Sequence, residues 1–189
     1  MRALVLLATL FTHPGQTQEL LIDDFRADDG RSALGTAWQG FSDRVMGGLS
    51  EMQAGIRDGE GGPVMLLSGR VRLENNGGFI QVRLPLHPRG QAFDARPWKG
   101  VALRVRGRPG SYYVHLRSRD SRLPWQYYAA TIELGTEWQD IRLPFTAFEG
   151  RSVRAPLDLA SLRTIAVVAY GEAFEAEIEI ARLAFYAEP

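Results

Sequence analysis

The stretch ENNGGFIQVRL, residues 74–84, decides the fold class because its second half alternates strictly between apolar and polar side chains. A period of two indicates a β-strand with one buried face. The pair Gly77–Gly78 in front of this strand marks a turn at which the strand begins. The apolar set is Ile80, Val82 and Leu84, and the polar set is Gln81 and Arg83.

The same period of two recurs along the chain, with turns that contain glycine and proline between the strands. One helical turn is expected near 157–162, with Asp158 or Pro156 close to its start. A change of parity after Ile180 predicts a β-bulge near Ala181–Arg182. We therefore expect an all-β sandwich of roughly nine or ten strands with very little helix. The expected strands cover residues 19–25, 64–73, 79–84, 101–106, 112–117, 127–134, 138–143, 165–170 and 178–186.

A chain of 189 residues with ordinary globular composition favours one domain, and we expect residues 19–189 to form a single β-sandwich domain. Residues 1–18 are interpreted as a candidate signal peptide or N-terminal extension. An apolar run at 3–11 follows Arg2 and has the length of a signal-peptide core. This run is too short to span a membrane, so no transmembrane segment is expected. The protein would be exported or periplasmic if residues 1–18 are a signal peptide, and cytoplasmic otherwise.

A second stretch, FSDRVMGGLS at 41–50, also places polar residues before a Gly–Gly pair. Both glycine stretches are interpreted as tight turns between strands, because paired glycines adopt backbone conformations that other residues disfavour. We expect Asp43 and Arg44 to pair with each other or with backbone amides across the two glycine turns. Asn75 or Asn76 is expected to form a hydrogen bond to the other loop.

Formal net charge is zero, but the middle of the chain is basic: residues 57–122 carry thirteen Arg or Lys against five Asp or Glu. Six arginines fall opposite the apolar set of their strands, so one sheet face would be basic if those strands are neighbours. Such a face could hold an anionic ligand, RNA or an acidic protein. The interpretation that we favour is a solvated outer face paired with the acidic ends of the chain. These arginines are Arg70, Arg72, Arg83, Arg104, Arg106 and Arg117.

Motifs for catalysis and metal binding are not found in the sequence. The absence of cysteine excludes disulfides and thiolate catalysis, and no HExxH, nucleophile elbow or Walker loop occurs. His115 shares its strand face with Tyr113 and Arg117 and is interpreted as a polar surface residue or a satisfied one. The pairs Asp23–Asp24 and Asp28–Asp29 could supply calcium ligands, but a solvated turn is favoured. We expect no enzymatic activity, no cofactor and no metal site.

Several motifs together carry a resemblance to a known family. Trp38 leads to SDRVMGGLS at 42–50, and SGRV at 68–71, ENNGGFIQVR at 74–83, VALRVRGRPGSYY at 101–113 and WQDIRLPFTAF at 138–148 follow. In these residues the chain resembles the NADH:ubiquinone oxidoreductase complex I intermediate-associated protein family, from about Ile22 to Phe185. The resemblance implies a jelly-roll β-sandwich of the galactose-binding-like type and a relation to carbohydrate-binding modules. Eukaryotic members assist the assembly of respiratory complex I as protein-binding factors. Members often carry an Asp in the turn that matches 107–110, where this chain has Arg108 and Pro109.

The resemblance implies a non-catalytic binding or assembly-factor-like module with an unidentified protein partner. The alternative is a carbohydrate-binding module, for which Trp98, Trp125, Tyr113 and Tyr127 are candidates for stacking on sugars or bases, although packing in the core or at its rim is the commoner fate of such residues. No nucleic acid is expected as a ligand. The residues expected to form or brace the functional surface are Trp38, Asp43, Arg44, Met46, Gly47, Gly48, Ser50, Asn75, Asn76, Gly77, Gly78 and Arg83.

Overall fold

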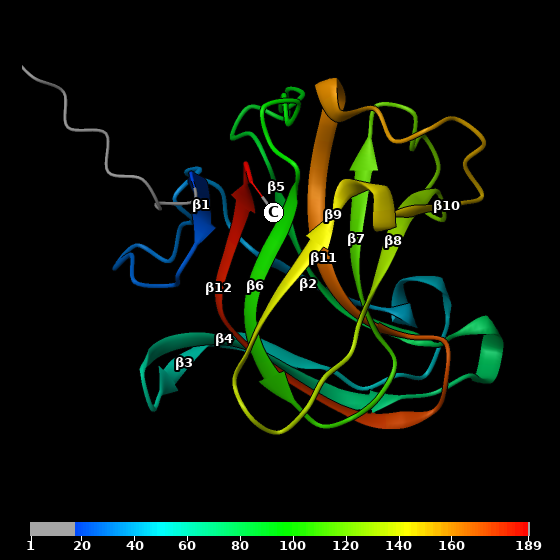
Figure 1. The fold of residues 1–189 in the computed structure, drawn as a ribbon. Coiled ribbons are helices and arrows are strands. Elements are labelled where there is room, and N and C mark those ends of the chain that lie inside the picture. Colours follow the sequence, from blue (N-terminus) through cyan, green and yellow to red (C-terminus); the bar gives the residue numbers. More distant parts are fainter. Residues whose placement is uncertain (1–17, 189) are drawn as a thin grey trace, which may run out of the picture.

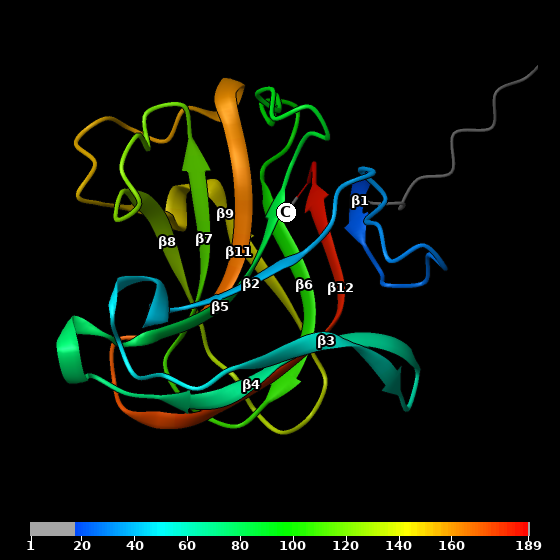
Figure 2. The same cartoon turned by 180° about the vertical axis from the view of Figure 1, so that it is seen from behind.

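The computed structural model describes residues 18–188, which form two six-stranded antiparallel sheets around a shared core (Figures 1 and 2). Sheet A has the strand order β3 (Gln53–Gly59), β4 (Gly62–Val71), β12 (Phe174–Tyr186), β6 (Gly100–Gly107), β9 (Gln139–Pro144), with β1 (Glu19–Asp23) also paired with β12. Sheet B has the order β10 (Glu149–Arg151), β8 (Tyr127–Ile132), β7 (Tyr112–Ser118), β11 (Leu162–Tyr170), β5 (Phe79–Pro85), β2 (Gln39–Ser42).

The prediction of an all-β jelly-roll sandwich is confirmed, and only the number of strands was underestimated. The described residues contain twelve strands, of which β2, β3 and β10 were not predicted. Strand β3 is exposed along nearly its whole length, so its sequence shows no alternation. Strands β2 and β10 have only four and three residues. The helical segments are short 3₁₀ turns: η1 (Asp43–Met46), η2 (Glu74–Asn76), η3 (Phe145–Ala147) and η4 (Leu159–Ser161).

The core forms where the apolar sides of the alternating strands of both sheets face each other. In β5 the residues Ile80, Val82 and Leu84 are buried, as their parity predicts. The long strand β12 pairs with β4 through its first half and with β1 through its second half, while β6 lies along its other edge. The register of β12 shifts between Ile180 and Arg182, which confirms the predicted bulge. Burial of this continuous apolar layer is the main stabilising term of such a fold.

The helical turn predicted near 157–162 is present as the short 3₁₀ turn η4. Asp158 caps η4, since its side chain accepts a hydrogen bond from the amide of Ala160 at 3.0 Å. The candidate signal peptide lies outside the described residues except for Gln18. Within residues 18–188, no helix has the length and apolarity required to cross a membrane.

Candidate functional site

The two glycine loops meet at one buried carboxylate, that of Asp43 at the start of η1. Its Oδ1 accepts a hydrogen bond from the amide of Ser50 at 2.9 Å, and its Oδ2 accepts one from the amide of Gly78 at 2.6 Å. The Ser50 hydroxyl and the amide of Phe79 also donate to Oδ2. The Ser50 hydroxyl oxygen in turn accepts from the amide of Arg72 at 2.9 Å. Asp43 therefore ties the loop after β2 to the loop before β5, and we call this arrangement the Asp43 hub.

Hydrogen bonds set the ionisation of the Asp43 hub. Burial alone would raise the pKa of Asp43, but the donors from Ser50, Gly78 and Phe79 outweigh burial and hold the pKa below its ordinary value. The carboxylate is therefore charged at neutral pH, and its charge is satisfied by oriented backbone amides. A buried charge is tolerated under this condition.

Two glycines are required by the close approach of Asp43 to both loops. A Cβ atom on Gly77 would lie 2.5 Å from Oδ2 of Asp43, and a Cβ atom on Gly48 would overlap the Asp43 side chain. Gly47 and Gly78 have φ angles of 88° and 126°, which side-chain-bearing residues rarely adopt. The two Gly–Gly pairs thus serve packing around one carboxylate.

Arg44 does not pair with Asp43, so that alternative of the prediction is wrong. Its Nε donates to the carbonyl of Ser50 at 3.0 Å instead, while Asp43 uses the backbone amides of the other alternative. Asn75 donates to the carbonyl of Gly47 at 3.3 Å, as expected for one of the two asparagines. Asn76 is exposed with a φ of 57°, the left-handed conformation that asparagine tolerates. Figures 1 and 2 show the two loops at the same end of the molecule.

Trp38 lies apart from the Asp43 hub and belongs to the core. Its Nε1 donates to Oδ2 of Asp23 at 2.8 Å, and its ring packs 5.9 Å from the ring of Phe25. Burial raises the pKa of Asp23 above its ordinary value, although hydrogen bonds from Phe25 and Trp38 act in the opposite direction. The neighbouring Asp24 pairs with Arg26. Among residues 18–188, no group of three or more His, Cys, Asp or Glu side chains gathers as metal ligands would.

The polar groups of the Asp43 hub are used internally, and the loops around it expose apolar side chains to solvent. Val45 is 69 % exposed and Met46 is 57 % exposed, both on η1. Leu49 and Leu73 are also exposed, at 38 % and 49 %. A contact by this end of the molecule would therefore be made by apolar side chains rather than by Asp43.

The six arginines that the sequence placed opposite the apolar sets do not share one face. On sheet A, Arg70 pairs with Glu175, Arg104 with Asp140 and Arg106 with Glu179. Arg72 follows β4 and pairs with Glu74. The predicted pairing with the acidic C-terminal part of the chain is thus seen for sheet A. The two remaining arginines, Arg83 and Arg117, lie on sheet B.

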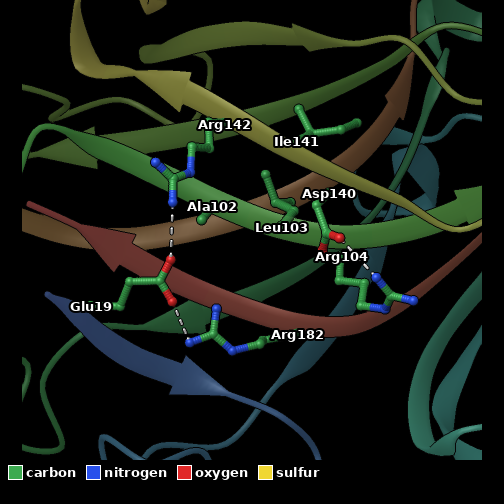
Figure 3. Close-up of a pocket in the computed structure, with 8 residues that line it drawn as sticks. All are labelled: Glu19, Ala102, Leu103, Arg104, Asp140, Ile141, Arg142 and Arg182. Atoms are coloured by element: carbon green, nitrogen blue, oxygen red, sulfur yellow. Dashed lines mark hydrogen bonds and ion pairs between the residues drawn. The ribbon is translucent and has the colours of Figure 1, made fainter. Parts of the chain in front are cut away.

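A pocket on sheet A holds three arginines and two carboxylates, all of which take part in ion pairs (Figure 3). Its volume is about 150 Å³. Glu19 of β1 lies between Arg142 and Arg182, at 3.8 Å and 2.6 Å. Arg104 and Asp140 form a second pair at 2.8 Å. Each guanidinium group already pairs with a carboxylate. A charged ligand would therefore gain little interaction energy in this pocket beyond what it has in water.

The outer face of sheet B, away from the core, carries aromatic rings and arginines, whereas the outer face of sheet A carries ion pairs. Arg83 of β5 lies in register with Ala166 of β11, which lies in register with His115 of β7. The strands β5, β11 and β7 run side by side (Figure 2). The three outward positions of β7 carry two aromatic rings and a guanidinium group, and β5, β8 and β11 add one such side chain each, with small or polar residues between them. We call this surface the aromatic–arginine face; its residues are Arg83, Tyr113, His115, Arg117, Tyr127 and Tyr170.

The aromatic rings of this face form one contiguous cluster. The imidazole of His115 stacks on Tyr127 with ring centroids 4.0 Å apart and an interplanar angle of 14°. Tyr113 meets Tyr170 edge to face at 6.2 Å, and both also lie within 6.4 Å of the His115 ring. Tyr170 is 40 % exposed, and Tyr113 and Tyr127 are half-buried. The cluster is thus packed against itself at its base and open to solvent at its top.

Burial shifts the pKa values of His115 and Tyr127 so that both rings stay neutral. It lowers the pKa of His115 to about 3, with the nearby positive charge of Arg151 adding to the effect. It raises the pKa of Tyr127 to about 12, with Tyr170 contributing in the same direction. At neutral pH the face therefore combines neutral rings with charged guanidinium groups.

The two arginines of the face are held without a carboxylate. The Arg83 guanidinium lies 4.2 Å from the centre of the Phe41 ring and makes no hydrogen bond or ion pair to another described residue. Arg117 donates to the carbonyl oxygens of Ser121 and Leu123 at 2.9 Å and 2.8 Å. Both side chains are half-buried. Their positive charges are therefore oriented by the fold and left uncompensated.

The sequence anticipated part of this face. Arg83, Tyr113 and Tyr127 were named, and Trp125, also named, is 57 % exposed on the loop between β7 and β8. Trp98 packs against the core instead. Tyr170 and the stacking role of His115 were missed. The sequence indicates only that these two residues lie on the outward side of their strands. It does not predict that β11 pairs with β5 and β7, because strand pairing depends on contacts between distant segments.

A family model described as Complex I intermediate-associated protein 30 (CIA30) matches residues 24–180 of the chain. No curated protein matches the chain.

Solved structures share the fold at low sequence identity. The chain is similar to the family 11 carbohydrate-binding module of the cellulosomal cellulase Lic26A-Cel5E of Clostridium thermocellum, with 17 % identity, a TM-score of 0.70 and coverage of 90 % of this chain and 95 % of that one. The chain is also similar to a family 11 module from Clostridium thermocellum in complex with a beta-1,3-1,4-mixed-linked tetrasaccharide. The sequence identity is 16 %, the TM-score is 0.68, and the match covers 90 % of this chain and 96 % of that one. A family 30 carbohydrate-binding module has 12 % sequence identity and a TM-score of 0.60, and the match covers 79 % of this chain and 82 % of that one.

Proposed function

This chain belongs to the Complex I intermediate-associated protein 30 family, and from that premise we propose that it is a non-catalytic binding module that holds a saccharide on the aromatic–arginine face. The observation that carries the proposal is the gathering of four aromatic rings on one outer sheet face beside two guanidinium groups that no carboxylate neutralises. Ligand sites commonly combine apolar, largely aromatic surface with a few well-placed polar groups.

A saccharide suits such a face on chemical grounds. The flat apolar side of a pyranose ring packs on an aromatic ring, and its hydroxyl groups accept hydrogen bonds from a guanidinium. The similarity of the fold to carbohydrate-binding modules, one of them solved with a mixed-linked tetrasaccharide, supports the choice of ligand class. The neutral state of His115 fits a residue that positions the Tyr127 ring rather than one that transfers protons.

The test is calorimetric titration of the full chain with a panel of neutral and acidic oligosaccharides. Replacement Tyr113→Ala or Tyr127→Ala is expected to weaken binding up to about tenfold, because an aromatic pair contributes about 0.5–1.5 kcal/mol beyond area burial. Trp138→Ala is the matched control, since this ring lies on sheet A beside Arg104 and Arg106. Absence of binding to every saccharide, or an equal loss in the Trp138 variant, would refute the proposal.

A protein partner at the Asp43 hub is a second candidate, and the exposed Val45 and Met46 favour it. We propose that these apolar side chains would contact an assembly partner, as the family description suggests. Photo-crosslinking from position 49, where Leu49 is exposed on the same loop, is expected to trap a defined protein in native membranes, and the double change Val45→Ser and Met46→Ser is expected to abolish its capture. Ile56→Ser is the control, because Ile56 is an exposed apolar residue on β3 at 42 % exposure. Equal capture by the folded double variant would exclude this surface.

A further inference from the structure

The arginines of the molecule divide into two groups by their partners. On the outer face of sheet A, the guanidinium groups of Arg57, Arg70, Arg104 and Arg106 each pair with a carboxylate. On the outer face of sheet B, Arg83 and Arg117 have no such partner among the described residues. The carboxylate available there, that of Glu149 on β10, is paired with Arg151. Sheet B thus presents two positive charges that no carboxylate of the structurally described part of the chain neutralises.

Burial makes this arrangement costly unless an anion is present. Desolvation lowers the pKa of Arg83 below its ordinary value. It also lowers the pKa of Arg117, to which the positive charges of Arg83 and Arg163 add. The same two groups have no carboxylate within ion-pair distance among the described residues. An anionic group placed on this face would relieve both effects.

The two arginines lie on strands that are separated by one strand of sheet B. Arg83 lies on β5 and Arg117 on β7, with β11 between them. Ala166 is the register partner of Arg83, and Thr164, two residues before it, is the partner of Arg117. With strands about 4.8 Å apart and a rise of about 3.4 Å per residue, the two Cα atoms are about 12 Å apart. An oligomer that carries several acidic groups can pair with both arginines at once while its remaining units extend over the neighbouring rings.

We propose that the ligand of the aromatic–arginine face is an acidic oligosaccharide, with carboxylate or sulfate groups that pair with Arg83 and Arg117 while its sugar rings lie on the aromatic cluster. This inference rests on the proposed saccharide-binding function and specifies its ligand. Planar guanidinium groups bind carboxylate and sulfate in a bidentate manner, which gives selectivity as well as affinity.

Nucleic acid is the competing anionic polymer, and the charge of the chain disfavours it. Nucleic-acid-binding domains are typically basic, with an isoelectric point above about 9. This chain has a formal net charge of zero, a sequence isoelectric point of about 6.9 and a single lysine. The local excess on sheet B is confined to a few arginines, which suits a short acidic glycan.

The experiment compares calorimetric titrations of the full chain with three probes of equal length: hexagalacturonate, a sulfated galactan hexasaccharide and neutral cellohexaose. Tighter binding of one acidic probe than of cellohexaose is expected, with a loss of affinity as salt is raised. The carboxylated and sulfated arms distinguish the two sources of negative charge. Arg83→Gln and Arg117→Gln are each expected to weaken acidic-probe binding about tenfold, the effect of losing one charge-assisted hydrogen bond.

Two controls separate charge recognition from folding. Arg89→Gln removes an exposed arginine from the turn after β5 and is expected to leave binding unchanged. Arg83→Lys retains the charge without the planar fork and is expected to bind more tightly than Arg83→Gln. Thermal unfolding of every variant checks that the sandwich is intact.

The outcomes distinguish this inference from the proposed function. Equal binding of neutral and acidic probes, unaffected by Arg83→Gln and Arg117→Gln, would refute the inference and leave saccharide binding in place. Binding of no saccharide would overturn both. Hexauridylate is titrated as a fourth probe, and its tighter binding than that of either acidic saccharide would replace the inference with nucleic-acid recognition.

Discussion

The Asp43 hub and the aromatic–arginine face use polar residues in opposite ways. In the hub, the carboxylate of Asp43 accepts hydrogen bonds from Ser50, Gly78 and Phe79, so its charge is satisfied inside the protein. On the face, Arg83 has no carboxylate partner among the described residues. The polar groups of the Asp43 hub therefore stabilise the fold. The guanidinium group of Arg83 on the aromatic–arginine face is not used in an ion pair within the described residues.

The largest expected effect is on stability when the Asp43 hub loses its acceptor. Asp43→Ala leaves several buried amide donors without a partner, and we expect a loss of about 3 kcal/mol or more in the free energy of unfolding. Urea unfolding measures it, with Asp58→Ala on the exposed strand β3 as the control. A variant as stable as the Asp58 control would show that the hub is not structural.

A smaller effect is expected from the glycines that surround Asp43. Gly77→Ala places a Cβ atom 2.5 Å from Oδ2 of Asp43 and should cost about 1–3 kcal/mol through overpacking. A Cβ atom on Gly47 would meet no other atom within 4 Å, so Gly47→Ala is strained only by the φ angle of 88°. This strain should lower the free energy of unfolding by about 1 kcal/mol. Thermal unfolding of the two variants compares these costs. A larger loss in the Gly47 variant would mean that backbone conformation, rather than approach to Asp43, dominates the loop.

The two regions should lose stability in different pH ranges. His115 has a pKa of about 3 in the folded protein against an ordinary value of 6.5, so the unfolded chain binds the proton first. Stability is therefore lost as pH falls below 6.5, by up to about 1.4 kcal/mol per pH unit. Asp43 has a lowered pKa, so its contribution is present above its ordinary value of 3.8 and is lost only as pH falls further.

Urea unfolding between pH 7 and pH 4.5 tests this separation. His115→Phe keeps a ring stacked against Tyr127 but cannot titrate, so its stability should fall less with decreasing pH than that of the wild-type protein. Parallel pH profiles of the two proteins would contradict a buried, neutral His115. The Asp43 hub is unchanged in this variant, so the difference between the profiles reports on the aromatic–arginine face alone.

Much of the architecture could be predicted because side-chain parity is local. The alternation of Ile80, Val82 and Leu84 gave the buried face of β5, and the change of parity after Ile180 gave the bulge of β12. The exposed strand β3 has no alternation, so it left no such signal. The pairing of sequence motifs identified the family before the fold was known.

The candidate binding face could be predicted only in fragments. Arg83, Tyr113 and Arg117 were known to point away from the core, but their distance from one another was not. Because β11 lies between β5 and β7, residues from three distant segments share one surface, and Tyr170 joins them. Arg104 and Arg106 lie on β6 in sheet A, where the carboxylates of Asp140 and Glu179 pair with them.

The sequence by itself determined the strands, their inward and outward sides, and the family to which the chain belongs. Only the tertiary structure decided that Asp43 joins two loops and that Arg83 and Arg117 lie beside an aromatic cluster with no carboxylate partner within residues 18–188. The physical reason is that the side on which a residue lies follows from its position along one strand. Its neighbours follow from the long-range pairing of strands, which depends on how the whole apolar surface is buried.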